Sequence, residues 1–269
     1  MRLITTLLLA VLLVLGIWSF IAYEPFLLGP SPDGYVWWWP KEISTFGQDI
    51  DGLFALLSWM ILFFFVLTEG VLVYAVWRFG KKSSEKGTFS HGNHKLEMLW
   101  TAIPAGLLLL IAFSQMSAWA SIKFAGATEG EPVFAEVIAS QFDWRFRYPG
   151  ADGIFGTVDD IENPFEFVVP DDQKIVVHLR SRDVLHSFFI PKMRVKQDAV
   201  PGMTIPVWFQ VDQEQLAEET DHSFDLICAE LCGWGHYKMA GRITVVSREE
   251  FDTWMAMKTD EKWSNGQED

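Results

Sequence analysis

Cysteine and positive charge are both scarce in this sequence of 269 residues. The only two cysteines, Cys228 and Cys232, lie four positions apart, and such a pair in an exported domain is often a disulfide. Lys and Arg number 21 against 35 Asp and Glu, which gives a formal net charge of −14. An acidic surface argues against binding to nucleic acid. The sequence also lacks the motif Cys-x-x-Cys-His, so we expect no c-type haem to be attached to it.

The acidity is concentrated in the C-terminal half of the chain. Residues 123–269 hold 14 Lys and Arg against 27 Asp and Glu, a net charge of −13. A surface of this kind favours a basic partner, which long-range attraction would steer towards it. An equally supported interpretation is that the charge only keeps the domain soluble.

Long apolar runs occupy residues 3–21, 53–77 and 96–121. Each run is close to the length of about 20 residues that spans a bilayer. The first run has no good signal-peptidase cleavage site, which favours a retained helix over a signal peptide for residues 1–22. Glu69 in the second run and Pro104 in the third are tolerated in helices that pack against neighbours.

The segment between the second and third runs sets the orientation in the membrane. Residues 78–95 carry five Lys or Arg and one Glu, so we expect this loop to be cytoplasmic. Residues 51–122 would then form a transmembrane helix hairpin, with an extracytoplasmic linker at 23–50. The acidic C-terminal half would also lie outside, on a protein that crosses the inner (plasma) membrane more than once.

The C-terminal half has the pattern of an all-β domain over residues 123–258. Gly, Pro and Asp separate short apolar runs, and many short strands at this spacing are typical of a β-sandwich or barrel. We expect a closing helix at 247–258, capped by Ser247, and a polar tail at 259–269. The expected strands are 134–139, 165–169, 174–180, 188–190, 204–211, 224–227 and 241–246.

Four potential metal ligands lie in one short segment of the sequence. Cys228, Cys232, His236 and Met239 stand at offsets 0, +4, +8 and +11. Soft sulfur combined with imidazole selects copper. A mononuclear blue-copper site uses one Cys, two His and usually a Met, so the second Cys indicates two coppers bridged by thiolates. A further His is then needed, and His186, at the end of an expected strand, is the best candidate.

Two alternatives to a dicopper site remain open from these residues. A structural zinc site would leave Met239 unused, and zinc sites usually repeat a short Cys pair twice. A disulfide between Cys228 and Cys232 would leave both His236 and Met239 unexplained.

These residues resemble cytochrome c oxidase subunit II, a family that carries a CuA centre in a cupredoxin domain. The resemblance covers residues from about 50 to 255 and is most specific at 228–239, at Asp-Val-Leu-His (183–186) and at Val-Lys-Gln-Asp-Ala-Val-Pro-Gly (195–202). It implies a cupredoxin-like Greek-key β-sandwich behind the helix hairpin. It also implies a set of copper ligands: the side chains of His186, Cys228, Cys232, His236 and Met239, and the backbone carbonyl of Glu230.

The resemblance also implies roles outside the copper ligands. The carboxylate of Glu230 would face subunit I and help to bind a magnesium or manganese ion at the interface. Glu97, in a segment that looks like the start of the family's last anchor helix, would lie at the cytoplasmic mouth of a proton pathway shared with subunit I. A carboxylate that only complements the helix dipole is equally supported for Glu97. The family's electron-entry patch usually reads Gln-Trp-x-Trp, but Phe142 replaces its first Trp here, so electron entry falls to Phe142 or Trp144, with a place in the core as the alternative for Trp144.

By this resemblance the chain takes electrons from a separate cytochrome c, soluble or membrane-bound, at two coppers on the extracytoplasmic side. It would pass them to haem in subunit I, for reduction of oxygen to water coupled to proton pumping, in a complex with other oxidase subunits. The alternatives are the corresponding subunit of a nitric oxide or nitrous oxide reductase and a copper-binding or delivery protein. A carrier needs exposed, exchangeable ligands and has no use for Glu97 or for an interface cation.

Overall fold

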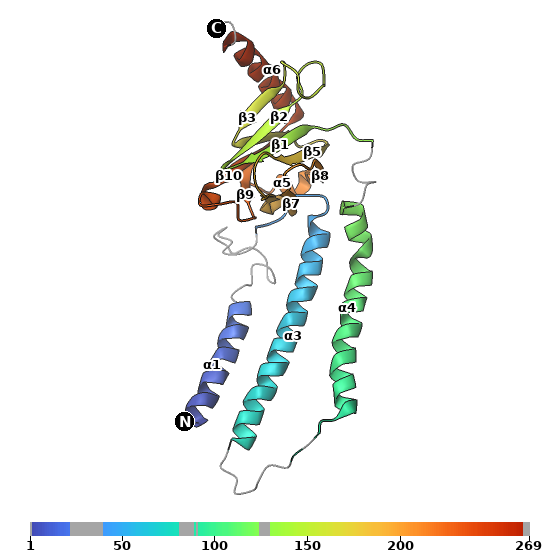
Figure 1. The fold of residues 1–269 in the computed structure, drawn as a ribbon, viewed down its shortest axis with the longest axis vertical. Helices are drawn as coiled ribbons and strands as arrows, with labels where there is room; N and C mark the ends of the chain where they lie inside the picture. The colour runs from blue at the N-terminus through green and yellow to red at the C-terminus, as the bar shows by residue number, and fades with distance from the viewer. Residues whose placement is uncertain (1, 22–39, 81–88, 90, 124–129, 266–269) are drawn as a thin grey trace. The chain divides into compact units, whose positions relative to one another are not determined.

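The structure is a computed structural model that describes residues 2–21, 40–80, 89, 91–123 and 130–265 (Figure 1). The chain divides into two compact units: one holds residues 1–39 and 51–117, and the other holds residues 40–50 and 118–269. Most of the predicted linker at 23–50, and the centre of the loop at 78–95, lie outside the described residues.

The first unit is helical. It is built from α1 (Arg2–Ile21) and from most of α3 (Gly47–Phe79) and α4 (His94–Lys123). Helices α3 and α4 are long and apolar enough to cross a membrane, which confirms the two spans predicted there. The side chain of Asn93 fixes the start of α4, because its Oδ1 accepts the backbone N–H groups of Lys95 and Leu96 at 3.1 and 3.2 Å.

The second unit is a β-sandwich (Figure 1). Its two five-stranded sheets have the orders β3-β2-β1-β5-β8 and β4-β10-β9-β6-β7. The predicted fold class, an all-β domain behind a helix hairpin, is confirmed. The first sheet holds β1 (Ala135–Ser140), β2 (Asp143–Tyr148), β3 (Ile161–Pro164), β5 (Lys174–Ser181) and β8 (Ile205–Gln210). The second holds β4 (Glu166–Pro170), β6 (His186–Ile190), β7 (Val195–Ala199), β9 (Ser223–Cys228) and β10 (Ala240–Val246). Short helices η2 (Pro191–Met193), α5 (Gln213–Leu216) and η3 (His236–Lys238) lie in the connections, and α6 (Arg248–Asn265) closes the chain.

Aromatic side chains from both sheets form the centre of the core. The rings of Phe146 and Phe167 stack with centroids 4.8 Å apart, and Trp144 meets Phe188 edge-on at 5.7 Å. All four side chains are fully buried. Each such burial contributes about 1.5–3 kcal/mol, so these contacts help to hold the two sheets together and fix β2 against β6.

All seven predicted strands are present, but strands β2, β3 and β7 were not predicted. In β2 the buried Trp144, Phe146 and Tyr148 alternate with partly exposed residues, which is the period of a strand with one buried face. Arg147 on its other face reaches the buried carboxylate of Glu136 on β1 at 3.1 Å. The short β3 and the polar β7 have too few apolar residues to give a pattern of their own.

The predicted linker at 23–50 is wrong in its last part, because residues 40–50 pack into the β-sandwich. Ile43 is fully buried, and Phe46 meets Trp208 edge-on with ring centroids 5.1 Å apart. The N–H of Ile43 donates to the carbonyl of Lys192 at 2.9 Å, and its carbonyl accepts the N–H of Asp212 at 2.8 Å. The first turn of α3 therefore belongs to the second unit.

Helix α6 extends beyond the predicted closing helix at 247–258 and ends at Asn265, so much of the predicted polar tail at 259–269 is helical. Lys258 pairs with Glu261 one turn ahead at 2.9 Å, and Lys262 donates to the carbonyl of Asp160. The ion pair and the hydrogen bond to Asp160 stabilise the last turns of α6. These turns have no apolar stripe from which a helix could be predicted. Residues 266–269 lie outside the described residues.

Candidate metal centre

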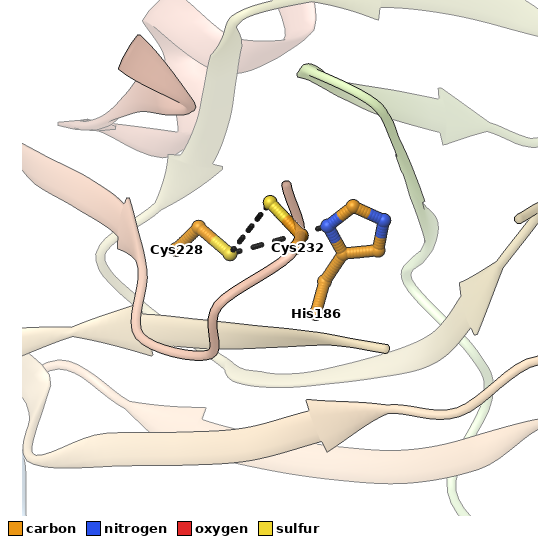
Figure 2. Close-up of side chains that lie close together, drawn as sticks. All are labelled: His186, Cys228 and Cys232. Carbon is orange, nitrogen blue, oxygen red and sulfur yellow. Dashed lines mark hydrogen bonds between the residues drawn. The ribbon is translucent and has the colours of Figure 1, made fainter. Parts of the chain in front are cut away.

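Pairing between β6 and β9 brings the predicted ligands together. His186 begins β6 and Cys228 ends β9, and in this antiparallel pair Phe188 lies opposite Cys228. The chain after β9 is held to β6 because the N–H of Ala229 donates to the carbonyl of Ser187 at 3.0 Å. Figure 2 shows the side chains of His186, Cys228 and Cys232 pointing towards one another from these segments.

The loop between β9 and β10 supplies the other potential ligands. Its two ends are joined by the N–H of Cys228, which donates to the carbonyl of Met239 at 3.1 Å. Helix η3 begins at His236 inside this loop and turns the chain back towards the sheet. As a result Cys232, His236 and Met239, which are spread along the sequence, face the same small volume.

The donor atoms lie within a few ångströms of one another. The Sγ atoms of Cys228 and Cys232 are 3.9 Å apart, and Nδ1 of His186 is 4.0 Å from Sγ of Cys228. Sγ of Cys232 is 3.7 Å from both Nδ1 of His236 and Sδ of Met239. His186, Cys228 and Cys232 form a group whose ligand atoms all lie within 4.8 Å of one another.

The set fits copper by the chemistry of its donors. Two thiols, two imidazoles and a thioether are soft or intermediate ligands, which suit copper better than magnesium or calcium. Both cysteines are free in the structure, and their sulfurs stand much farther apart than the roughly 2.05 Å of a disulfide bond. Among the described residues, the structure therefore brings all five predicted side-chain ligands to one place.

Burial shields most of these donors from water. His186 is 0% exposed, and Cys228, Cys232 and Met239 are at most 7% exposed, whereas His236 is half-buried. Burial, and then the neighbouring Cys228 thiol, raises the pKa of Cys232 to about 11. Without metal Cys232 is thus a neutral thiol at pH 7, and binding a metal ion must displace its proton.

Asp183, to which the sequence analysis assigned no role, positions His186. Its Oδ1 lies 2.8 Å from Nε2 of His186, which leaves Nδ1 to face the sulfur atoms. Burial opposes ionisation of Asp183, but hydrogen bonds from His186 and from the N–H groups of Gln141 and Val184 outweigh it and lower the pKa of Asp183. A charged carboxylate behind a ligand imidazole fixes its orientation and its tautomer. The spacing Asp-x-x-His was the available signal.

Replacing Asp183 by Asn should weaken copper binding without removing the ligands. The amide is a poorer acceptor for the Nε2–H of His186, and loss of such a partner typically costs about 10–100-fold in metal affinity. Competition with a copper chelator in the purified protein measures the change. Asp172→Asn is the matched control, because Asp172 pairs with Arg248 through a half-exposed ion pair. Equal affinities in both variants would contradict a positioning role for Asp183.

The two predicted electron-entry aromatics differ sharply in exposure. Trp144 is 0% exposed and lies behind His186, with ring centroids 6.3 Å apart, so it is a core residue. Phe142 is half-buried and meets Trp234, which is 80% exposed, at 5.2 Å. Trp234 was not considered in the sequence, although it stands between two of the potential ligands.

The two predicted acidic groups lie in different units. The backbone carbonyl of Glu230 is 3.2 Å from Sγ of Cys228, and the Glu230 side chain is half-buried. Glu97 is in the first turn of α4, in the helical unit, with its carboxylate 3.4 Å from Nδ1 of His94. The structure thus places Glu230 beside the metal ligands and Glu97 in the helical unit.

A β-sandwich with a buried set of thiol, imidazole and thioether ligands, carried on apolar helices, defines a membrane-anchored copper domain of the cupredoxin-like class. Comparison with known proteins agrees with this class. Residues 137–246 match the family "Cytochrome C oxidase subunit II, periplasmic domain", and residues 40–117 match "Cytochrome C oxidase subunit II, transmembrane domain". The chain belongs to the cytochrome c oxidase subunit II family.

Individual relatives carry the same name. The chain is 29% identical to "Alternative cytochrome c oxidase subunit 2" of Bradyrhizobium diazoefficiens, over 81% of this chain and 83% of that protein. It is also 29% identical to "Cytochrome c oxidase subunit 2" of Cereibacter sphaeroides, over 80% of this chain and 77% of that protein. The crystal structure of the periplasmic domain of subunit II of cytochrome oxidase from Bradyrhizobium japonicum is 27% identical, with a TM-score of 0.40, over 47% of this chain and 93% of that chain.

Proposed function

We propose that this chain is the electron-accepting subunit of a respiratory cytochrome c oxidase, in which it receives electrons from a cytochrome c. The observation that carries the proposal is the convergence of His186, Cys228, Cys232, His236 and Met239 in a family member with two membrane-spanning helices. Electrons would continue to haem in subunit I, where oxygen is reduced to water with proton pumping. Other oxidase subunits would complete the complex.

The five side chains, with the backbone carbonyl of Glu230, would hold two copper ions. When bound, such a pair would supply a one-electron carrier with delocalised charge. The chain contributes a prearranged set of donors: Asp183 holds His186, and the Cys228–Met239 hydrogen bond holds the loop. Burial of the sulfurs excludes water, which reduces the rearrangement that accompanies a change of charge.

The buried ligands favour an electron carrier over a copper-delivery protein. A delivery protein must release its metal to a partner, yet His186 is 0% exposed and both cysteines are at most 7% exposed. Membership of the cytochrome c oxidase family favours oxygen over nitric or nitrous oxide as the final acceptor.

The experiment that tests the function is metal analysis and turnover of the purified complex. We expect two coppers per chain, a mixed-valence electron paramagnetic resonance signal and oxygen uptake with reduced cytochrome c. One copper or one zinc per chain would contradict the dicopper site. Turnover with nitric oxide but not with oxygen would contradict the oxidase assignment.

We further propose that the copper domain lies on the extracytoplasmic side of the inner membrane. The basic residues of the loop at 78–95 support this orientation, since cytoplasmic loops carry an excess of Lys and Arg. Protease treatment of intact spheroplasts should therefore remove the domain that follows α4.

Glu230 is proposed to bind magnesium or manganese at the interface with subunit I through its carboxylate. Glu230→Gln should keep both coppers, because the backbone carbonyl is unchanged, but should weaken the hard-cation site, since an amide is a poorer ligand than a carboxylate. Manganese electron paramagnetic resonance and the copper spectrum, measured on one sample, separate the two effects. Loss of the copper spectrum with the manganese signal intact would reverse the assignment.

Glu97 is proposed to collect protons at the cytoplasmic mouth of a pathway shared with subunit I. Its place in the first turn of a membrane-spanning helix, far in sequence from every copper ligand, supports a role apart from the copper site. Glu97→Ala should slow turnover of the whole oxidase, because a group that transfers protons is lost, with an unchanged copper spectrum. Turnover equal to the wild type at every pH would instead favour a carboxylate that only complements the helix dipole.

A further inference from the structure

Trp234 is the most exposed large aromatic side chain on the loop that carries the metal ligands. It lies between Cys232 and His236 and is 80% exposed. Leaving so much apolar surface in water forgoes the free energy of burying it. Tryptophan in such a position is typical of residues that become buried in a partner's surface, where it often dominates the binding energy.

The ring of Phe142 packs against the ring of Trp234. The two rings meet edge-on with centroids 5.2 Å apart, and Phe142 itself is half-buried. The Phe142 ring also lies directly against the loop backbone, since a Cβ atom added at Gly233 or Gly235 would come within 3.2 or 2.5 Å of its carbons. Glycine at these two positions is what allows the contact.

A hydrogen bond fixes the same contact at the backbone. The side-chain amide of Gln141 donates to the carbonyl of Cys232, and the backbone N–H of Gln141 donates to Asp183 at 2.7 Å. The turn at Gln141 and Phe142 is therefore tied both to the ligand loop and to the carboxylate behind His186. These hydrogen bonds and the Phe142 contact therefore hold the part of the loop that carries Trp234 in place.

We propose that Trp234, supported by Phe142, is the contact through which the electron donor docks and delivers its electron. The proposal rests on the proposed function. Trp234 is two residues from Cys232 and two from His236, so a donor that touches its ring comes close to two ligands at once. Trp144 does not serve this purpose, because it is 0% exposed.

The chemistry of this surface identifies the kind of partner. The donor is a redox protein whose haem edge emerges in an apolar patch, and basic groups on it would complement the net charge of −13 on residues 123–269. The donor would lose one electron in the encounter and the copper held by the ligand residues would gain it, with no bond broken and no proton transferred. Phe142, at the position of the family's usual entry Trp, becomes the support for the entry residue instead.

The test compares Trp234→Leu and Trp234→Phe in the purified oxidase complex with Trp263→Leu as the matched control. Trp263 is also exposed, at 51%, but lies near the end of α6. Copper content, subunit composition and the copper spectrum are recorded first. The donor's dissociation constant is then measured by surface plasmon resonance, and the second-order rate of copper reduction by stopped flow. A small-molecule reductant is used in parallel.

We expect Trp234→Leu to raise the dissociation constant and lower the rate with cytochrome c by about tenfold each, as for a central interface tryptophan. Trp234→Phe should lose about threefold, because a smaller ring keeps part of the contact. The rate with the small reductant, the copper spectrum and the Trp263→Leu variant should match the wild type.

Three results would overturn the proposal. A full rate and an unchanged dissociation constant in Trp234→Leu would place electron entry elsewhere. Loss of subunit I from the Trp234→Leu complex would show that this side chain lies in the subunit interface. An equal loss of rate with the small reductant would mean that the copper site itself is damaged. If the proposed function itself is wrong, the wild-type complex will accept electrons from the small reductant but from no cytochrome c. That result differs from all three outcomes for Trp234→Leu.

Discussion

Replacing either Cys228 or Cys232 by Ser should abolish the copper centre and with it all turnover with cytochrome c. Each sulfur faces several other donors within about 4 Å, and a hydroxyl is neither soft nor ionised at pH 7. We expect copper affinity to fall by at least about a hundredfold, beyond the usual effect of losing a supporting residue. Copper analysis and near-infrared absorption of the purified complex measure the loss.

Met239→Leu provides the contrast to the cysteine variants. A thioether is a weak ligand, so its loss should keep both coppers and shift their reduction potential. Leu fills a similar volume, which matters because Met239 is 2% exposed. Met257→Leu, at an exposed position on α6, controls for the substitution itself. If Met239→Leu removed copper as completely as Cys228→Ser, the ranking of the ligands would be wrong.

Electron delivery by a basic cytochrome c should depend strongly on salt. The net charge of −13 on residues 123–269 lies largely on the surface, since buried, unpaired charge is too costly. We expect the second-order rate of copper reduction to fall by about tenfold or more between low salt and about 0.15 M, where the Debye length is roughly 8 Å. Stopped-flow measurements across a salt series test this expectation.

A neutral small-molecule reductant is the control, because its rate should not change with salt. A flat rate with cytochrome c as well would mean that the acidity serves solubility, or that the natural donor is tethered or acidic. Local pairing does not remove the field, since an ion pair leaves the net charge of the domain unchanged.

The structure shows which acidic groups are exposed and which are buried or paired with a basic residue. Among the acidic residues at 159–162, Asp160 and Glu162 both lie within 3.6 Å of Arg147, and Asp160 is buried. Among those at 214–221, Glu218 pairs with Lys41 and Glu219 with Lys192. Glu214 and Asp221 are exposed, and Asp221 accepts the N–H of Ser223 at 2.9 Å and lies 3.7 Å from Arg242. The exposed acidic field therefore owes more to residues 214–221 than to residues 159–162.

The sequence alone determined the membrane-spanning helices, the all-β domain and the ligand loop. These features depend on local patterns: apolar length for α3 and α4, alternation for most strands, and the spacing of Cys228, Cys232, His236 and Met239. A pattern within one segment is readable because each residue's partners are a few positions away. The same limit explains why β3 and β7, which are short or polar, were not predicted.

Only the tertiary structure decided which distant residues meet. Pairing of β6 with β9 places His186 beside Cys228, and the close approach of Gln141 and Phe142 to the ligand loop gives Trp234 its support. Tertiary packing likewise places Trp144 in the core and leaves Phe142 half-buried. Residues 40–50 join the β-sandwich because Ile43 and Phe46 pack between elements that are far apart in the chain. Such contacts are set by long-range packing, so no local spacing in the sequence records them.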